Sequence, residues 1–151
     1  MRNFAKIAVA IGAVTLATSS FAQPKPEAFV KHRQSAMALM GWYFGSLGPV
    51  AKGEKPFNKE DAVRATGFLV PLSKMPWEGF VPGTETVGNT RALPEVWKFN
   101  ADFKELATTM QTEMGKLAAL ANAGDEAGFK KQFGAVGKSC KNCHDDFQKK
   151  P

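Results

Sequence analysis

The sequence predicts an all-α protein, an antiparallel up-down-up-down four-helix bundle. Apolar residues recur three and four positions apart in four separate segments, which is the spacing of one face of an α-helix. Short links join several of these segments and favour antiparallel neighbours. No segment shows the alternation of a β-strand. The chain has 151 residues, 44% of them apolar, and therefore fits one globular domain.

Residues 1–22 are predicted to be a secretory signal that is removed from the mature protein. A short basic start, an uncharged apolar run over residues 7–16 and small residues before a cleavage site at Ala22 are typical of such signals. The alternative is a membrane anchor, but this run is much shorter than the ~20 residues a spanning helix needs. The mature domain, residues 23–151, is therefore expected in the periplasm and outside the membrane.

The mature chain is mildly basic. Removing Arg2 and Lys6 lowers the formal charge from +6 to +4. This charge fits a weak preference for acidic partners. No run of Lys and Arg interleaved with aromatic residues is present, so nucleic-acid binding is not expected.

The first helix is expected over residues 26–44. Pro26 suits a first helical turn, because an N–H at that position has no helical partner. Gly45, Gly48 and Pro49 follow and are expected to end the helix. One stripe of this helix holds the residues that recur three and four apart: Phe29, Arg33, Ala36, Met37, Met40 and Phe44.

The second helix is expected over residues 59–73. Asn58 precedes it and is a good N-cap, because its side chain accepts a hydrogen bond from a free N–H of the first turn. Pro71 should distort the last turn. The apolar side is formed by Val63, Thr66, Phe68, Leu69 and Leu72.

Residues 74–93 form a long connection that is rich in Pro, Gly and Asn, which favour turns. Trp77, Phe80 and Val81 lie within it. A solvated linker does not need three large apolar residues. We therefore expect this connection to fold over an apolar part of the molecule.

Two further helices follow. The third is expected over residues 94–122, and Asn122 and Gly124 predict its end. Asp125 then caps a fourth helix that continues to about residue 149. The stripe of this fourth helix is regular and contains Phe129, Phe133, Val136, Cys140, Cys143 and Phe147.

Cys140, Cys143 and His144 form a Cys-x-x-Cys-His motif on the fourth helix. This motif is the attachment signal of a c-type haem. Two thiols add to vinyl groups on neighbouring pyrrole rings, and the next residue presents an imidazole to the iron. Residues three apart share a helix face, and the following residue lies about 100° further round. We therefore predict one haem c, bound through both cysteines in the core of the bundle.

The two cysteines fit a redox pair, a zinc site or a disulfide less well. A thioredoxin-like redox pair needs a preceding strand, and none is predicted. A zinc site needs a fourth ligand, and His32 is the only other histidine. A disulfide between residues three apart in a helix has poor geometry. Haem attachment also protects two core thiols of an exported chain from oxidation.

At these positions the sequence resembles the cytochromes c′, four-helix bundles with Cys-x-x-Cys-His near the C-terminus. The resemblance covers nearly all of the mature chain. Ordinary cytochromes c instead carry the motif near the N-terminus, with a ligating Met well after it. The matching segments are residues 31–37 (KHRQSAM), 52–57 (KGEKPF), 76–80 (PWEGF), 83–85 (GTE), 94–97 (PEVW) and 136–147 (VGKSCKNCHDDF).

The resemblance implies a five-coordinate, high-spin haem with His144 as its proximal ligand and an apolar opposite face. It also implies a homodimer formed through the first two helices. One position departs from the family: Gln148 stands where many members have a basic residue on the proximal side, and a neutral amide offers no charge there. The other haem-contacting positions of the family match Arg33, Gln34, Met37, Trp77, Phe80 and Asn89.

Arg33 and Met37 each leave two interpretations open. Arg33 is a charge on an apolar stripe, and an unpaired buried charge is costly. A haem propionate would pair with it in bidentate geometry; the alternative is a surface salt bridge with a nearby acid such as Glu27. Met37 lies one turn later. Its sulfur either stays off the iron and leaves an apolar site, or ligates the iron as in cytochromes c-556.

The sequence predicts a binding or electron-transfer protein and not an enzyme. An apolar open site favours NO, and CO more weakly, because these gases need little polar help, whereas methionine ligation suits plain electron transfer. No distal His/Arg pair for peroxide chemistry is visible. Lysines near the motif would steer an acidic periplasmic redox partner or simply solvate the helix end: Lys138, Lys141, Lys149 and Lys150.

Overall fold

The computed structural model describes residues 24–150, so the predicted secretory signal lies outside the described residues. Within this range the chain forms five α-helices and one short 3-10 helix. In that range no helix is long and apolar enough to cross a bilayer. The elements are α1 (Pro26–Ala51), α2 (Lys59–Leu72), η1 (Pro76–Gly79), α3 (Glu95–Lys98), α4 (Asn100–Ala123) and α5 (Glu126–Phe147).

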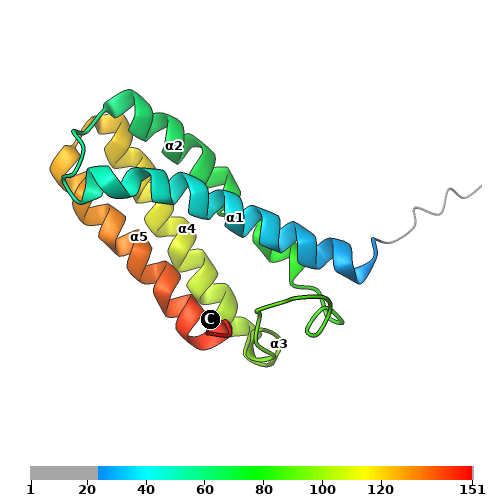
Figure 1. Ribbon diagram of the computed structural model, residues 1–151. Helices are drawn as coiled ribbons and strands as arrows, with labels where there is room; N and C mark the ends of the chain where they lie inside the picture. The colour runs from blue at the N-terminus through cyan, green and yellow to red at the C-terminus, as the bar shows by residue number, and fades with distance from the viewer. Residues whose placement is uncertain (1–23, 151) are drawn as a thin grey trace, which may run out of the picture.

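The four long helices, α1, α2, α4 and α5, form the predicted up-down-up-down bundle (Figure 1). Successive long helices run in opposite directions, and α4 packs extensively against both α2 and α5. The N-terminal part of α1 extends beyond the other helices, over the connection that leads from α2 to α3 (Figure 1). This end of the bundle also holds the C-terminus, so the connection and the end of α5 are neighbours.

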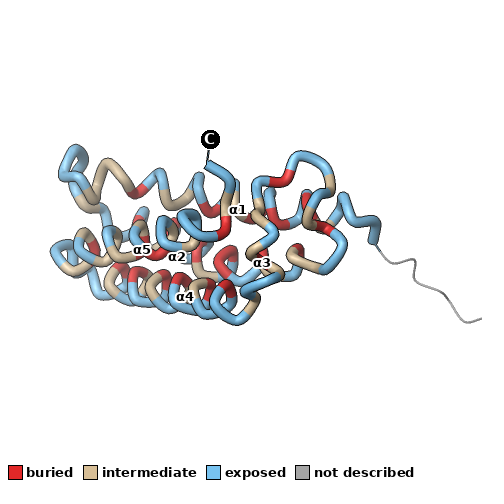
Figure 2. Tube along the Cα trace, turned by 90° about the horizontal axis from the view of Figure 1, so that it is seen from below, coloured by how far each residue is buried: buried red, intermediate tan, exposed pale blue. Residues whose placement is uncertain are grey.

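Buried residues recur along the inner side of each long helix (Figure 2). The larger of two apolar clusters lies between α1, α2, α4 and α5 and includes the fully buried Leu69, Leu117 and Phe129. The smaller cluster joins Val96, Phe103 and Phe147 at the end of the bundle. Close packing of such side chains is the main favourable contribution to a bundle of this size.

The predicted starts of two helices are confirmed by their caps. The side chain of Asn58 accepts a hydrogen bond from the N–H of Asp61 at 2.8 Å, and α2 begins at Lys59. The side chain of Asp125 accepts from the N–H of Gly128 at 2.9 Å. Gly124, with φ +72°, takes the left-handed conformation that ends α4 and that a side chain would strain.

The predicted end of the first helix was wrong, because α1 continues to Ala51 with Pro49 inside it. A proline costs its helix one N–H donor, but local propensity is overridden where the helix face is packed. Leu47 is only 4% exposed in the core, and the ring of Tyr43 stacks on that of Phe68 with centroids 4.7 Å apart. These contacts with α2 keep the last turns of α1 helical.

The third predicted helix is interrupted. Phe99 has φ −112° and ψ 50°, which separates the short α3 from α4. The break turns Val96 inward, where it is 1% exposed against Phe103 and Phe147. It also lets the indole N–H of Trp97 donate to the carbonyl of Val81 at 3.2 Å. Packing of α3 against the connection and the end of α5 therefore prevails over one straight helix.

The last helix ends at Phe147, slightly earlier than predicted, because the chain after it pairs with the connection. Gln148 and Ala92 form an isolated antiparallel β-bridge. The N–H of Lys149 donates to the carbonyl of Arg91 at 2.8 Å, and the N–H of Leu93 donates to the carbonyl of Phe147 at 3.0 Å. No strand pattern in the sequence predicted this pairing.

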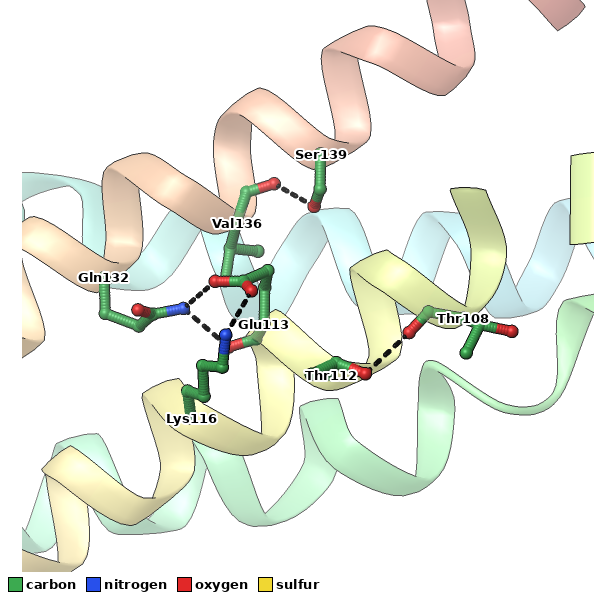
Figure 3. A network of polar contacts seen from close by, with 7 residues as sticks. All are labelled: Thr108, Thr112, Glu113, Lys116, Gln132, Val136 and Ser139. Atoms are coloured by element: carbon green, nitrogen blue, oxygen red, sulfur yellow. Dashed lines mark hydrogen bonds and ion pairs between the residues drawn. The ribbon is translucent and has the colours of Figure 1, made fainter. Parts of the chain in front are cut away.

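A polar contact fastens α4 to α5 midway along the bundle (Figure 3). The side-chain amide of Gln132 donates to the carboxylate of Glu113 at 2.6 Å and to its backbone carbonyl at 3.0 Å. Lys116 donates to the other carboxylate oxygen at 2.6 Å. The hydrogen bonds from Lys116 and Gln132 lower the pKa of Glu113, because they stabilise its charged form.

We predict that this carboxylate makes the bundle acid-sensitive. A pKa lowered by folding contributes stability above the unfolded value, about 4.3 for Glu, and that contribution is lost as the pH falls through the folded value. In Glu113→Gln, the urea midpoint should therefore fall less between about pH 5 and pH 3 than in the unsubstituted protein. Glu105→Gln, at an exposed position of α4, is the control with the same charge change. Parallel pH profiles for all three proteins would contradict the prediction.

Candidate haem site

A cavity of about 920 Å³ lies between α1, α4, α5 and the connection that follows η1. Its size is at the upper end of the range usual for ligand and cofactor sites. Apolar side chains from three helices and the connection form most of its surface. Every residue that the sequence suggested as a haem contact lines this cavity: Arg33, Gln34, Met37, Trp77, Phe80, Asn89, Cys140, Cys143 and His144.

Cys140, Cys143 and His144 lie on α5, where its last two turns face the cavity. Both cysteines are half-buried and free. Burial raises the pKa of Cys140 and, with the charges of Cys140 and Asp146, that of Cys143 to about 11. Both sulfurs are therefore protonated thiols at neutral pH.

His144 is suited to the role of a neutral ligand. Burial and the nearby charge of Arg91 lower its pKa, and a neutral imidazole is the form that binds a metal. Over residues 24–150, no three His, Cys, Asp or Glu side chains are grouped to hold a metal ion by themselves. The site therefore offers one imidazole beside two thiols, a donor set that fits an iron carried by a porphyrin.

The rest of the cavity is apolar. Met37 lies on its α1 side. Sequence reasoning missed the contribution of α4, which supplies five further lining residues: Phe103, Leu106, Ala107, Met110 and Met114. Apolar periodicity does not separate side chains that touch one another from side chains that surround a cavity.

The long connection folds over an apolar region, as predicted. The ring of Phe80 lies 4.9 Å from that of Phe103, and the ring of Trp77 lies 5.5 Å from it, both edge to face. Such geometry is favourable for aromatic rings. The indole N–H of Trp77 donates to the carbonyl of Ser73 at 2.7 Å, so this residue is anchored as well as packed.

Arg33 is 3% exposed and binds the connection. Its Nη1 donates to the carbonyl of Gly79 at 2.7 Å and to Oγ1 of Thr84 at 2.8 Å. Its Nη2 donates to the carbonyl of Thr84 at 3.1 Å and to Oγ1 of Thr90 at 2.8 Å. Burial lowers the pKa of Arg33, and the charge of Glu85 partly offsets this effect. An arginine remains charged after such a shift.

These contacts bear on both interpretations that the sequence left open for Arg33. Within the described residues, the salt bridges do not include a pair between Arg33 and Glu27. The two terminal nitrogens already have one acceptor for each N–H. Bidentate pairing with a propionate would therefore require at least one of them to leave the connection.

The neighbours of Arg33 also contact the connection. The side-chain amide of Gln34 donates to the carbonyl of Asn89 at 2.9 Å, so two predicted site residues contact each other. The imidazole of His32 bonds the carbonyl of Met75 at 2.8 Å. Three successive residues of α1 therefore hold the connection at its start, middle and end.

Gln148, the predicted departure from the family pattern, lines the cavity from the end of α5. Arg91, which the sequence did not indicate, directly precedes Ala92, the residue that pairs with Gln148 in the β-bridge. Its guanidinium donates to the carbonyl of Lys149 from Nη2 at 2.7 Å and from Nε at 3.2 Å. The connection therefore supplies a positive charge near His144 although Gln148 is neutral. The position of Arg91 near His144 follows from the backbone pairing of residues 91–93 with residues 147–149 and is not visible in the sequence.

A family model described as Cytochrome C' matches residues 28–148. The chain belongs to this family. A cytochrome c′ from Alcaligenes xylosoxydans xylosoxydans is 44% identical over 126 residues, which cover 83% of this chain and 97% of the relative. A cytochrome c-556 from Agrobacterium tumefaciens is 34% identical over 122 residues, covering 80% of this chain and 97% of that protein.

Solved structures agree with this assignment. The nitric oxide complex of a leucine-to-alanine mutant of cytochrome c prime from Alcaligenes xylosoxidans superposes with a TM-score of 0.80 at 42% identity, covering 86% of this chain and all of that one. The cytochrome c′ of Rubrivivax gelatinosus gives 0.80 at 37% identity, covering 83% and 98% of the two chains. These comparisons favour cytochrome c′ over cytochrome c-556 for this chain.

The family fixes the cofactor. Cytochromes c′ carry haem c, so this chain is a mono-haem c-type cytochrome. The cavity fits the group by its chemistry: two thiols three residues apart on one helix face, an imidazole at the next position, and apolar walls for the porphyrin. Arg33 and Arg91 also line the cavity and add positive charge to its wall.

Proposed function

We propose that this chain is an exported, periplasmic cytochrome c′ with a five-coordinate haem that binds NO and CO and transfers single electrons. Cys140 and Cys143 would hold the haem by thioether bonds, and His144 would bind its iron. The observation that carries the proposal is the asymmetry of the cavity: α5 supplies thiols and an imidazole, whereas α1 supplies Met37 among apolar side chains.

The residues of the chain have separate roles in this mechanism. The haem, when bound, supplies an iron that changes its charge by one electron and takes a gaseous ligand. Cys140 and Cys143 would fix the position of the porphyrin, and His144 would supply the imidazole that binds its iron. Apolar residues of α1 and α4 exclude water from the other side.

The choice of gas follows from the donors. Bound dioxygen needs a hydrogen-bond donor, whereas NO and CO do not. Gln34 donates to the carbonyl of Asn89, and the terminal nitrogens of Arg33 donate to the connection. The polar side chains of Arg33 and Gln34, about one turn before Met37 on α1, are thereby engaged elsewhere. The nitric oxide complex of the Alcaligenes xylosoxidans relative supports NO as a ligand here.

Electron transfer would use the surface near the haem motif. Lys138, Lys149 and Lys150 are exposed there and can steer an acidic periplasmic partner. Lys141 is paired with Asp145 one turn later on α5, so it contributes less charge to this surface than its position in the sequence suggests. None of these residues provides chemistry for an enzymatic reaction, and we assign none.

A homodimer through α1 and α2 completes the proposal. Trp42 is 72% exposed and Leu39, three residues earlier on α1, is 49% exposed. On α2, Phe68 is 47% exposed and stacks on Tyr43 of α1. Exposed aromatic residues of this kind are enriched in interfaces. Phe44 and Leu47, on the same part of α1, instead pack inside the bundle.

We predict that the reduced protein has a broad high-spin Soret band and binds CO. Met37→Ala should leave the iron high-spin and increase the CO association rate, because the side chain that limits space on the α1 side is shortened. Stopped-flow mixing with CO measures the rate. Met75→Ala, at an exposed methionine outside the cavity, is the control. A sharp low-spin α-band that disappears in Met37→Ala would identify Met37 as a ligand and refute the open site.

The dimer is tested by charge placed on its proposed surface. Trp42→Glu should weaken dimerisation by about 30-fold or more, the effect of losing a central aromatic anchor. Sedimentation velocity over a concentration series measures this. Phe99→Glu, at an exposed aromatic residue between α3 and α4, should leave the dimer intact. A monomeric unsubstituted protein, or equal effects of both variants, would contradict the proposed surface.

A further inference from the structure

The connection between α2 and α3 is organised around one buried cation. The guanidinium of Arg33 makes four hydrogen bonds to it, and their acceptors come from positions eleven residues apart, Gly79 to Thr90. Thr84 and Thr90 are themselves 1% and 7% exposed. A charged donor forms stronger hydrogen bonds than a neutral one, and more so when water is excluded. The folded course of this segment therefore depends on Arg33.

The aromatic neighbours of Arg33 strengthen the same contact. Its guanidinium carbon lies 4.7 Å from the ring centroid of Phe80 and 5.6 Å from that of Trp97, within the range of cation–π attraction. The segment also lies directly on α1: a Cβ at Gly79 would come within 2.6 Å of the carbonyl oxygen of Phe29. Glycine is required there so that its carbonyl can reach Arg33.

The segment that Arg33 holds is also a wall of the haem cavity. Phe80 follows Gly79 directly and lines the cavity, as do Asn89 and Thr90. Thr84 holds Arg33 but does not line the cavity. A substitution at Thr84 can therefore remove a hydrogen bond to Arg33 without changing a residue that lines the cavity.

We propose that Arg33 is a positioning residue that fixes the segment 79–90 as a closed wall of the haem cavity and thereby limits the rate at which gaseous ligands enter. This inference rests on the proposed gas-binding function. In this role Arg33 acts on the segment 79–90 of the polypeptide, whereas its position in the sequence suggested a direct contact with a haem propionate.

Thr84 distinguishes the two roles. Its hydroxyl accepts from Nη1 of Arg33 and donates to the carbonyl of Val81 at 2.7 Å. Thr84→Val removes both bonds while nearly keeping the shape of the side chain, and it changes no residue that lines the cavity. If Arg33 served the haem alone, this substitution would leave the wall and the ligand rate unchanged.

The experiment compares haem-loaded proteins by hydrogen exchange of the amides in residues 79–90 and by the CO association rate of the reduced form. Thr84→Val should accelerate exchange about tenfold, the effect of losing one charge-assisted hydrogen bond, and should increase the CO rate several-fold. Thr84→Ser keeps the hydroxyl and should behave like the unsubstituted protein. Thr108→Val is the matched control, because Thr108 is exposed on α4 and its hydroxyl bonds only its own helix.

Each outcome decides a separate point. Unchanged exchange in Thr84→Val would overturn the fastening role of Arg33. Faster exchange with an unchanged CO rate would overturn its control of ligand entry, while leaving the gas-binding function intact. Failure of the unsubstituted protein to bind CO would refute the proposed open site and, with it, the role of Arg33 in ligand entry. Hydrogen exchange in residues 79–90 would still show whether Arg33 holds this segment in place.

Discussion

The structure depends on the packing of an apolar cofactor between α1, α4 and α5. Protein cores are close-packed and rarely contain spaces larger than a water molecule, yet a cavity of about 920 Å³ lies between α1, α4 and α5. If water filled this cavity, the methionines and phenylalanines that line it would lose much of their apolar packing. Haem supplies the missing apolar volume, and attachment to Cys140 and Cys143 keeps it there. The cofactor is therefore part of the core as much as it is the site of reaction.

The two sides of this cavity are built differently. On one side, α5 supplies thiols and imidazole from a rigid helix whose packing on α4 is reinforced by Gln132 and Glu113. On the other side, α1 supplies Met37 and holds a long connection through Arg33 and its neighbours. Attachment thus lies on the most firmly packed pair of helices, and the proposed ligand access lies beside the segment held by the side-chain hydrogen bonds of Arg33.

Much of this arrangement is predictable from local chemistry. Asn58 and Asp125 cap their helices through contacts within three residues, and the Cys-x-x-Cys-His spacing acts within one turn. Features that depend on distant residues were missed. Packing of Leu47 carries α1 through Pro49, the environment of Val96 breaks the helix at Phe99, and pairing of Ala92 with Gln148 brings Arg91 towards His144. Arg33 was recognised as unusual, but its partners lie 46 to 57 residues away, and an apolar stripe does not identify them.

The central claim is that one haem is tethered to α5 and occupies the middle of the bundle. Intact-mass analysis of the protein purified from the periplasm tests it most directly. We expect a single species that begins at Gln23 and exceeds the polypeptide mass by one haem, and a pyridine haemochrome spectrum with two thioether links. A bare polypeptide of unmodified mass, with both sulfurs open to alkylation after unfolding, would contradict the account.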